Sequence, residues 1–159
     1  MALDARPTHV EALALRATPR LEDDDFDGAK QDADRALVGD ASNAKALSVS
    51  AFLAAARHDW SAALDQSDRA LRSDPTWLEA VCINGWASAQ LGDLATATRR
   101  LHELREAGSK DFADLLEPYE RQLQSSASAS ARRRSISNAM HGVKTVKAII
   151  DIARGAFGT

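Results

Sequence analysis

The chain has 159 residues, of which 45% are apolar and 5% aromatic, and its formal net charge is −3. This length suits one domain of ordinary size, and the apolar share is normal for a globular chain. Cys82 is the only cysteine, which excludes an internal disulfide, and no apolar run has the length of a signal peptide or a membrane-spanning helix. We therefore expect an intracellular protein, most simply a cytoplasmic one.

A spacing of 34 residues recurs through the first two thirds of the chain. Three aspartates keep this step, and each precedes an apolar residue: Asp25, Asp59 and Asp93. Small residues keep it at two further positions: Ala17, Ala51 and Gly85, and Ala29, Ala63 and Ala97. Such a repeat, built from two helices, indicates an array in which each unit buries its apolar face against its neighbours. Abundant alanine and the lack of alternating apolar runs favour an all-α fold.

In chain order, the pattern first predicts the remnant of a preceding helix at residues 1–8. Ala2-Leu3 precede Pro7 as Ala70-Leu71 precede Pro75, so we expect either a fragment of a longer array or an array without its outer cap. Three helix pairs follow, at 9–21 with 26–38, 44–56 with 60–72, and 77–90 with 94–107.

Local residues support these helix boundaries. The three spaced aspartates can each cap the second helix of a pair and complement its dipole. Pro19 removes a backbone hydrogen bond, so the first helix should kink or end early. After Gly108, a further apolar pattern up to residue 124 predicts a closing helix that covers the last pair.

The chain resembles the tetratricopeptide repeat (TPR) family over residues 2–124. The matching residues are the small residues at the helix crossings, the aspartates that begin the second helices, and Pro75 after the second repeat. The resemblance implies a TPR-type α-solenoid of three helix pairs plus a capping helix, at residues 9–124. His58 departs from the family pattern, because it replaces the glycine that Gly92 supplies in the third repeat.

A second region follows the array. Residues 125–131 form a Ser/Ala linker, and residues 132–159 predict a separate basic amphipathic helix. Its apolar stripe comprises Ile136, Met140, Val143, Val146 and Ile150, and its basic residues include Arg132, Arg133, Arg134, Lys144 and Lys147. Residues 131–159 hold six basic residues and one acidic residue, a net charge of +5, which leaves −8 for residues 1–130. This asymmetry favours docking of the tail on an acidic surface.

The sequence predicts no enzymatic chemistry. The four histidines lack metal-ligand spacing, and there is neither a phosphate-binding glycine loop nor a nucleophile signature, so we expect no metal site and no cofactor. Nucleic acid is disfavoured as a partner, because the array is acidic and no aromatic residues alternate with the basic ones.

The resemblance also implies where a partner binds. In TPR proteins the first helix of each pair lines an inner groove, and the candidate groove residues here are Lys45, Ser48, Phe52, Glu79, Trp86 and Gln90. Phe52 and Trp86 are the expected exposed aromatic anchors for a peptide or helix. We therefore expect a scaffold or adaptor that binds a protein partner, with the tail as a second docking element. The alternatives are a peripheral adaptor whose tail binds an anionic membrane, and a structural subunit of a large assembly. Self-association or intramolecular docking through the tail is also open.

Overall fold

The computed structural model describes residues 7–125, which contain seven α-helices and no strand. The helices are α1 (Pro7–Glu22), α2 (Phe26–Gly39), α3 (Ala44–Ala56), α4 (Trp60–Ser73), α5 (Leu78–Gln90), α6 (Leu94–Glu106) and α7 (Lys110–Ser125). The all-α prediction is confirmed for this part of the chain, and the six paired helices begin and end within two residues of their predicted limits. Most of the predicted linker, the tail helix and residues 1–6 of the predicted helix remnant lie outside the described residues.

Two details at the start of the chain differ from the prediction. Pro7 begins α1, whereas the prediction placed it in the remnant of a preceding helix at residues 1–8; the fixed φ of proline suits the first turn of a helix. Pro19 does not end α1, which continues to Glu22. The proline ring removes one hydrogen bond only, and the carbonyl oxygen of Pro19 still accepts the backbone N–H of Asp23 at 3.0 Å.

Each helix pair is closed by a three-residue turn with the same geometry. The middle residue has a positive φ in every case: 61° at Asp24, 60° at His58 and 89° at Gly92. The next residue is the predicted aspartate, whose carboxylate accepts a backbone N–H three residues on, at 2.9, 3.1 and 3.0 Å for Asp25, Asp59 and Asp93. The predicted caps are therefore confirmed.

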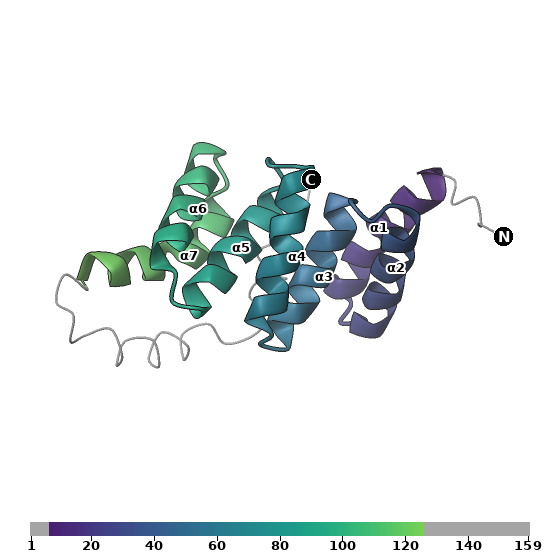
Figure 1. Ribbon diagram of the computed structural model, residues 1–159, viewed down its shortest axis with the longest axis horizontal. Coiled ribbons are helices and arrows are strands. Elements are labelled where there is room, and N and C mark those ends of the chain that lie inside the picture. Colours follow the sequence, from purple (N-terminus) through teal and green to yellow (C-terminus); the bar gives the residue numbers. More distant parts are fainter. Residues whose placement is uncertain (1–6, 126–159) are drawn as a thin grey trace.

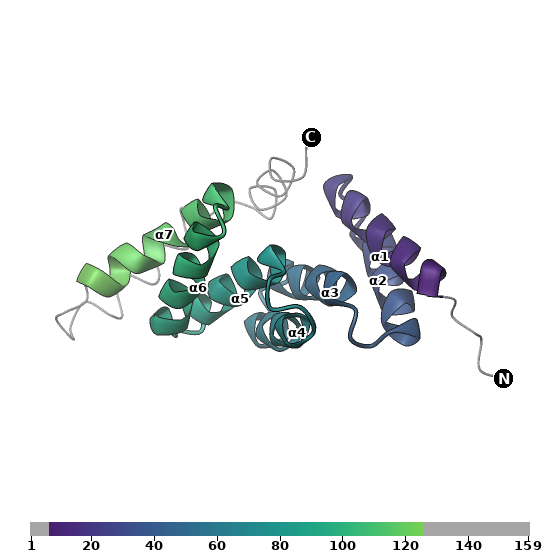
Figure 2. The same ribbon diagram turned by 90° about the horizontal axis from the view of Figure 1, so that it is seen from above.

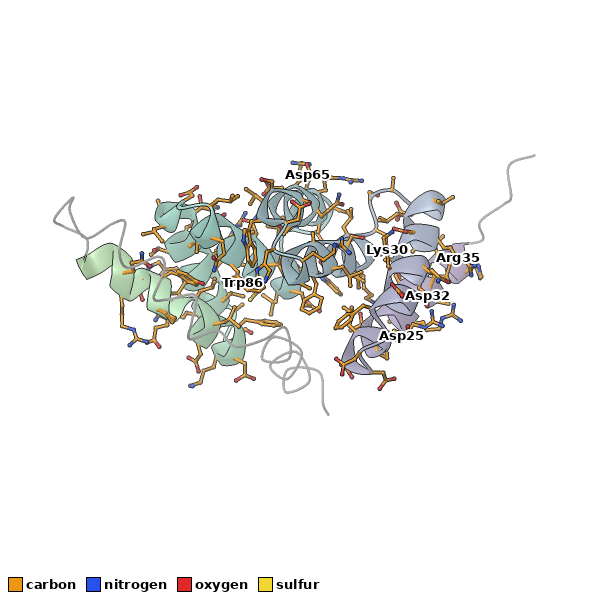
Figure 3. All side chains as sticks on the ribbon, turned by 90° about the horizontal axis from the view of Figure 1, so that it is seen from below. Asp25, Lys30, Asp32, Arg35, Asp65 and Trp86 are labelled. Atoms are coloured by element: carbon orange, nitrogen blue, oxygen red, sulfur yellow. The ribbon has the colours of Figure 1, made fainter. Side chains whose placement is uncertain are left out.

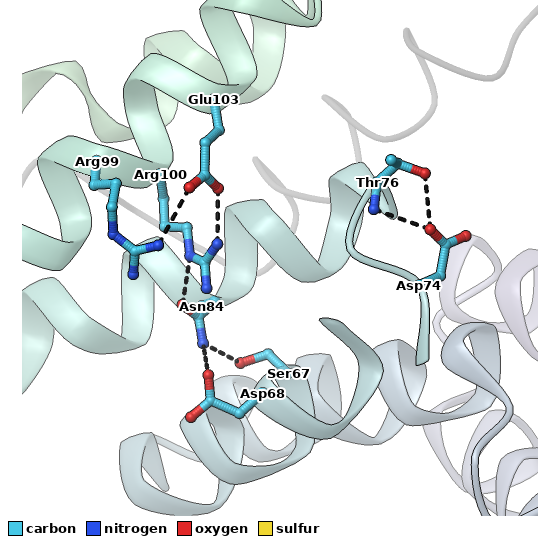
Figure 4. Close-up of polar contacts among 8 residues, drawn as sticks. All are labelled: Ser67, Asp68, Asp74, Thr76, Asn84, Arg99, Arg100 and Glu103. Atoms are coloured by element: carbon cyan, nitrogen blue, oxygen red, sulfur yellow. Dashed lines mark hydrogen bonds and ion pairs between the residues drawn. The ribbon is translucent and has the colours of Figure 1, made fainter. Parts of the chain in front are cut away.

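The connections between pairs also repeat. Asp40 accepts both the backbone N–H and the hydroxyl of Ser42, at 2.9 and 2.7 Å. One repeat later, Asp74 accepts the same two groups of Thr76 at the same distances (Figure 4). These aspartates fix the loop that leads from one pair to the next.

Small side chains let the helices within each pair cross closely. The in-phase residues Ala17, Ala51, Ala29 and Ala63 are fully buried. At Gly85, a Cβ atom would lie 2.5 Å from Leu116 Cδ1 and 2.9 Å from Arg100 Cβ. Gly85 thus leaves room for Leu116 of α7. α7 packs on both α5 and α6, and it closes the last pair as predicted.

The pairs follow one another along a curve. Consecutive helices pack together, and α1 also contacts α3, α3 contacts α5, and α5 contacts α7. Figure 1 shows the succession of helices, and Figure 2 shows that α3 and α5 lie on the inner side of the curve and α4 and α6 on the outer side. We call the surface carried by α1, α3, α5 and α7 the inner face. Among the helices of residues 7–125, none has the length and apolar character that a bilayer crossing requires.

Candidate functional site

Three charged residues of the inner face keep the 34-residue step. Glu11 on α1 and Lys45 on α3 form an ion pair, with Lys45 Nζ 3.0 Å from Glu11 Oε1. The Lys45 ammonium also lies 5.5 Å from the centre of the Trp77 ring, a cation–π contact. Glu79 on α5 is the third member of the series, and it forms no ion pair with any described residue.

The Glu79 carboxyl group is partly buried without a cation in contact. Burial raises its pKa above the ordinary value, and a hydrogen bond from its own backbone N–H and attraction to Lys45 offset that shift only in part. When burial removes water from a carboxyl group and no ion pair replaces that water, the charged form of the group is destabilised. A cation bound beside Glu79 would restore this lost stabilisation.

Glu79 lines a pocket of about 630 Å³ between the starts of α5 and α7. Its carboxyl groups belong to Asp74, Glu79 and Asp111, and its apolar side chains include Trp77, Leu78 and Phe112. Lys110 also lines it, but the Lys110 ammonium is already 2.7 Å from Asp114. The position on α7 one repeat after Glu79 holds Ala113, so the series of charged residues ends at Glu79.

The start of α5 departs from that of α3. Asn43 caps α3 by accepting the backbone N–H of Ala46 at 3.0 Å, whereas Trp77, one repeat later, makes no capping hydrogen bond with its side chain. The Trp77 indole N–H is buried and has no hydrogen-bond partner among the described residues. An aromatic residue at a cap position breaks a local rule, and this is the sequence signal that could have pointed to the pocket.

The expected exposed aromatic anchors are not exposed. Phe52 is 6% and Trp86 7% accessible, which corrects the prediction. The two side chains belong to the apolar core instead of facing a groove. Trp86 stacks edge-on against Trp60, with ring centres 4.9 Å apart, and Figure 3 shows it among the helices.

Two more of the six groove candidates, Ser48 and Gln90, also make internal contacts. Ser48 is buried, and its hydroxyl donates to the carbonyl oxygen of Ala44 at 2.9 Å. Gln90 donates to the Tyr119 hydroxyl at 2.8 Å and so ties α5 to α7. Lys45 is engaged as well, with Glu11 and the Trp77 ring, so Glu79 is the charged candidate that has no ion pair with a described residue. The pocket adds Trp77 and Asp111, which the sequence did not point to.

Two kinds of chemistry find no support in residues 7–125. No cluster of three or more His, Cys, Asp or Glu side chains there could hold a metal ion. Burial raises the pKa of the Cys82 thiol to about 12, so this thiol stays protonated at neutral pH and is a poor nucleophile. The candidate tail residues, both apolar and basic, lie outside the described part of the chain.

Comparison with known proteins adds no relative from which a function could be transferred. No protein-family model matches the chain, and no curated protein matches it.

Proposed function

We propose that this protein is a non-enzymatic adaptor with a TPR-type α-solenoid, and that it binds a partner polypeptide at the pocket between α5 and α7. The in-phase caps, the repeated turns and the inner face formed by alternate helices support the solenoid. The observation that carries the binding role is Glu79, a partly buried carboxyl group without an ion pair at the edge of an open pocket.

The lining favours a partner segment that carries a basic side chain next to an apolar one. Three carboxyl groups outnumber the single ammonium group of Lys110, whose charge Asp114 already balances. The starts of α5 and α7 each contribute about half a positive charge, which reduces this preference without reversing it. Trp77 supplies an aromatic surface on which an alkyl stem can lie, although the Lys45 ammonium already lies 5.5 Å from its ring centre.

The test is selection of peptides from a random display library against the full-length protein. We expect enrichment of peptides with an arginine or lysine beside an apolar residue, and loss of their binding in Glu79→Lys. Asp65→Lys is the matched control, because Asp65 is an exposed residue on α4 that does not line the pocket.

Circular dichroism should show equal helicity for both variants. Peptides that bind Glu79→Lys as well as the wild type would place the site elsewhere. A selection that enriches nothing would contradict the adaptor role.

A further inference from the structure

The pocket between α5 and α7 holds negative charge that its own residues do not balance. Two of its carboxyl groups, those of Glu79 and Asp111, form no ion pair with any described residue. The Asp74 carboxylate accepts the backbone N–H and the hydroxyl of Thr76, which are neutral groups (Figure 4). Lys110 contributes an ammonium group, but that group already forms an ion pair within α7. A cation from outside the pocket can therefore still be bound there.

The carboxyl groups along the rest of α7 are less available to such a cation. Three of them are in ion pairs of 2.7–3.6 Å: Asp114 with Lys110, Glu120 with Arg105, and Glu117 with Arg121. A basic segment that approaches this side of the molecule therefore finds unpaired carboxyl groups at the start of α7, beside Asp111 and Glu79.

The chain itself carries a segment with the chemistry that this lining favours. Residues 143–147 read Val-Lys-Thr-Val-Lys, so each lysine directly follows a valine. In the helix that the sequence predicts for residues 132–159, Lys147 comes one turn after Val143 and one turn before Ile150. Such a helix presents an ammonium group between two apolar side chains on one side.

The length of the chain brings this segment to the pocket. α7 has 16 residues, so its end at Ser125 lies about 24 Å from the pocket at its start. Lys147 is the sixteenth residue of a helix that begins at residue 132, and it also lies about 24 Å from that beginning. Six residues, 126–131, connect the two helices, within the usual range of about 2–8 for antiparallel neighbours. A tail helix that runs back beside α7 therefore carries Lys147 to the level of the pocket.

Charge and covalent linkage both favour docking within one chain. Residues 131–159 carry a net charge of +5 and residues 1–130 a net charge of −8, so the two parts attract each other. A short linker holds its two ends at an effective concentration of about 1 mM. A second copy at micromolar concentration competes poorly with a tail that is held this close.

We propose that Val143–Lys147 docks in the pocket between α5 and α7 of the same chain, with Lys147 paired to Glu79 and Val143 packed on the apolar lining. The tail is then an internal ligand that a partner polypeptide must displace. This inference rests on the proposed function, because it fills the same pocket with the same chemistry. At an effective concentration of about 1 mM and a Kd of about 0.1 mM, the tail fills the pocket about nine tenths of the time and weakens a competing peptide about tenfold.

The test uses a nitroxide spin label on the full-length, isotope-labelled protein. The label is attached at Thr145→Cys, on the side of the predicted helix opposite Val143. Cys82 is buried, and its pKa is raised to about 12, so the new cysteine takes the label. We expect the label to broaden the amide signals at the starts of α5 and α7 and to leave those of α2 unchanged.

An exchange of charges identifies the ion pair. Lys147→Glu alone and Glu79→Lys alone should each remove most of the broadening at the pocket, and the two changes together should restore it. The matched control combines Lys147→Glu with Asp65→Lys, because Asp65 is exposed on α4 and does not line the pocket. This combination should restore nothing.

A mixed sample, with the spin label and the isotope on different chains, should show no broadening. Broadening there would mean that a second copy supplies the tail, which overturns the proposal. It is also overturned by broadening centred on another part of the array, by no broadening at all, by broadening unchanged in Glu79→Lys, or by a charge exchange that restores nothing.

The outcome is separable from that of the proposed function. Library peptides that require Glu79, found without tail docking, would uphold the adaptor role and refute this inference. Tail docking at the pocket, with no library peptide enriched, would uphold this inference and refute the adaptor role.

Discussion

The middle residue of each intra-pair turn carries a backbone conformation that side chains resist. Asp24, His58 and Gly92 all have a positive φ, and only glycine adopts it without a steric cost of about 1–2 kcal/mol. Aspartate tolerates this conformation better than most residues. Histidine, like aspartate, is enriched at positive φ, and the His58 ring also contacts Trp60, at 5.4 Å between ring centres.

We predict opposite effects for two exchanges at this turn position. Gly92→Ala should lower the free energy of unfolding by about 1 kcal/mol, because its Cβ would meet no atom within 4 Å and only the backbone cost remains. His58→Gly should be neutral or stabilising. Chemical denaturation of both variants measures the two changes, and a destabilised His58→Gly would show that the ring contact outweighs the strain.

Glu79 predicts a pH-dependent stability. Because its pKa is raised in the folded state, the carboxyl group favours folding while it is protonated, below about pH 4.5, and loses this contribution as the pH rises through the folded-state pKa. Glu79→Gln should therefore be more stable than the wild type at pH 7, and the difference should vanish on acidification. Urea unfolding at a series of pH values checks this. If Glu79→Gln is instead less stable than the wild type at pH 7, Glu79 is ion-paired in the folded protein.

At the scale of the helix, Gly85 sets how closely α7 approaches. A Cβ atom there would clash with Leu116 and Arg100, although Gly→Ala normally stabilises a helix by about 1 kcal/mol. We predict that Gly85→Ala destabilises the protein by about 1–3 kcal/mol.

In a Leu116→Ala background the same Gly85→Ala exchange should cost much less, because the closest clashing atom is gone. A double-mutant cycle of unfolding free energies measures this coupling. Additive effects would show that α7 does not depend on the close approach at Gly85.

An element could be predicted from the sequence where it is formed by contacts between residues that are close in sequence. The helices, turns and caps were predictable because a cap such as Asp59 bonds a group three residues away. The burial of Phe52 and Trp86 was not, since it depends on contacts with other helices, such as that of Trp86 with Trp60 of α4, which no local pattern encodes. Of the two outcomes predicted at Pro19, a kink or an early end, the early end does not occur, because α1 packs on its neighbours and continues to Glu22.

At the scale of the whole molecule, the array and the basic tail carry opposite net charges, which favours docking of the tail on the array. We predict that residues 135–154 are helical and docked on protein, because full burial of a large apolar side chain contributes about 1.5–3 kcal/mol. Amide exchange of the lipid-free protein should then show protection in this segment. Co-sedimentation with anionic vesicles is the companion measurement. Rapid exchange without lipid, with protection on vesicles alone, would establish the membrane-adaptor alternative instead.

The order of contacts along the chain also bears on how the protein reaches its fold. The main packing contacts all join helices that are one or two steps apart in sequence. Loops closed during folding are therefore short, which lowers their entropic cost and favours rapid folding. Each helical hairpin can serve as a nucleus, and growth proceeds from it in either direction. At equilibrium, structure should then be lost progressively from the ends, so that α3, α4 and α5 are the last helices to exchange their amide protons with solvent.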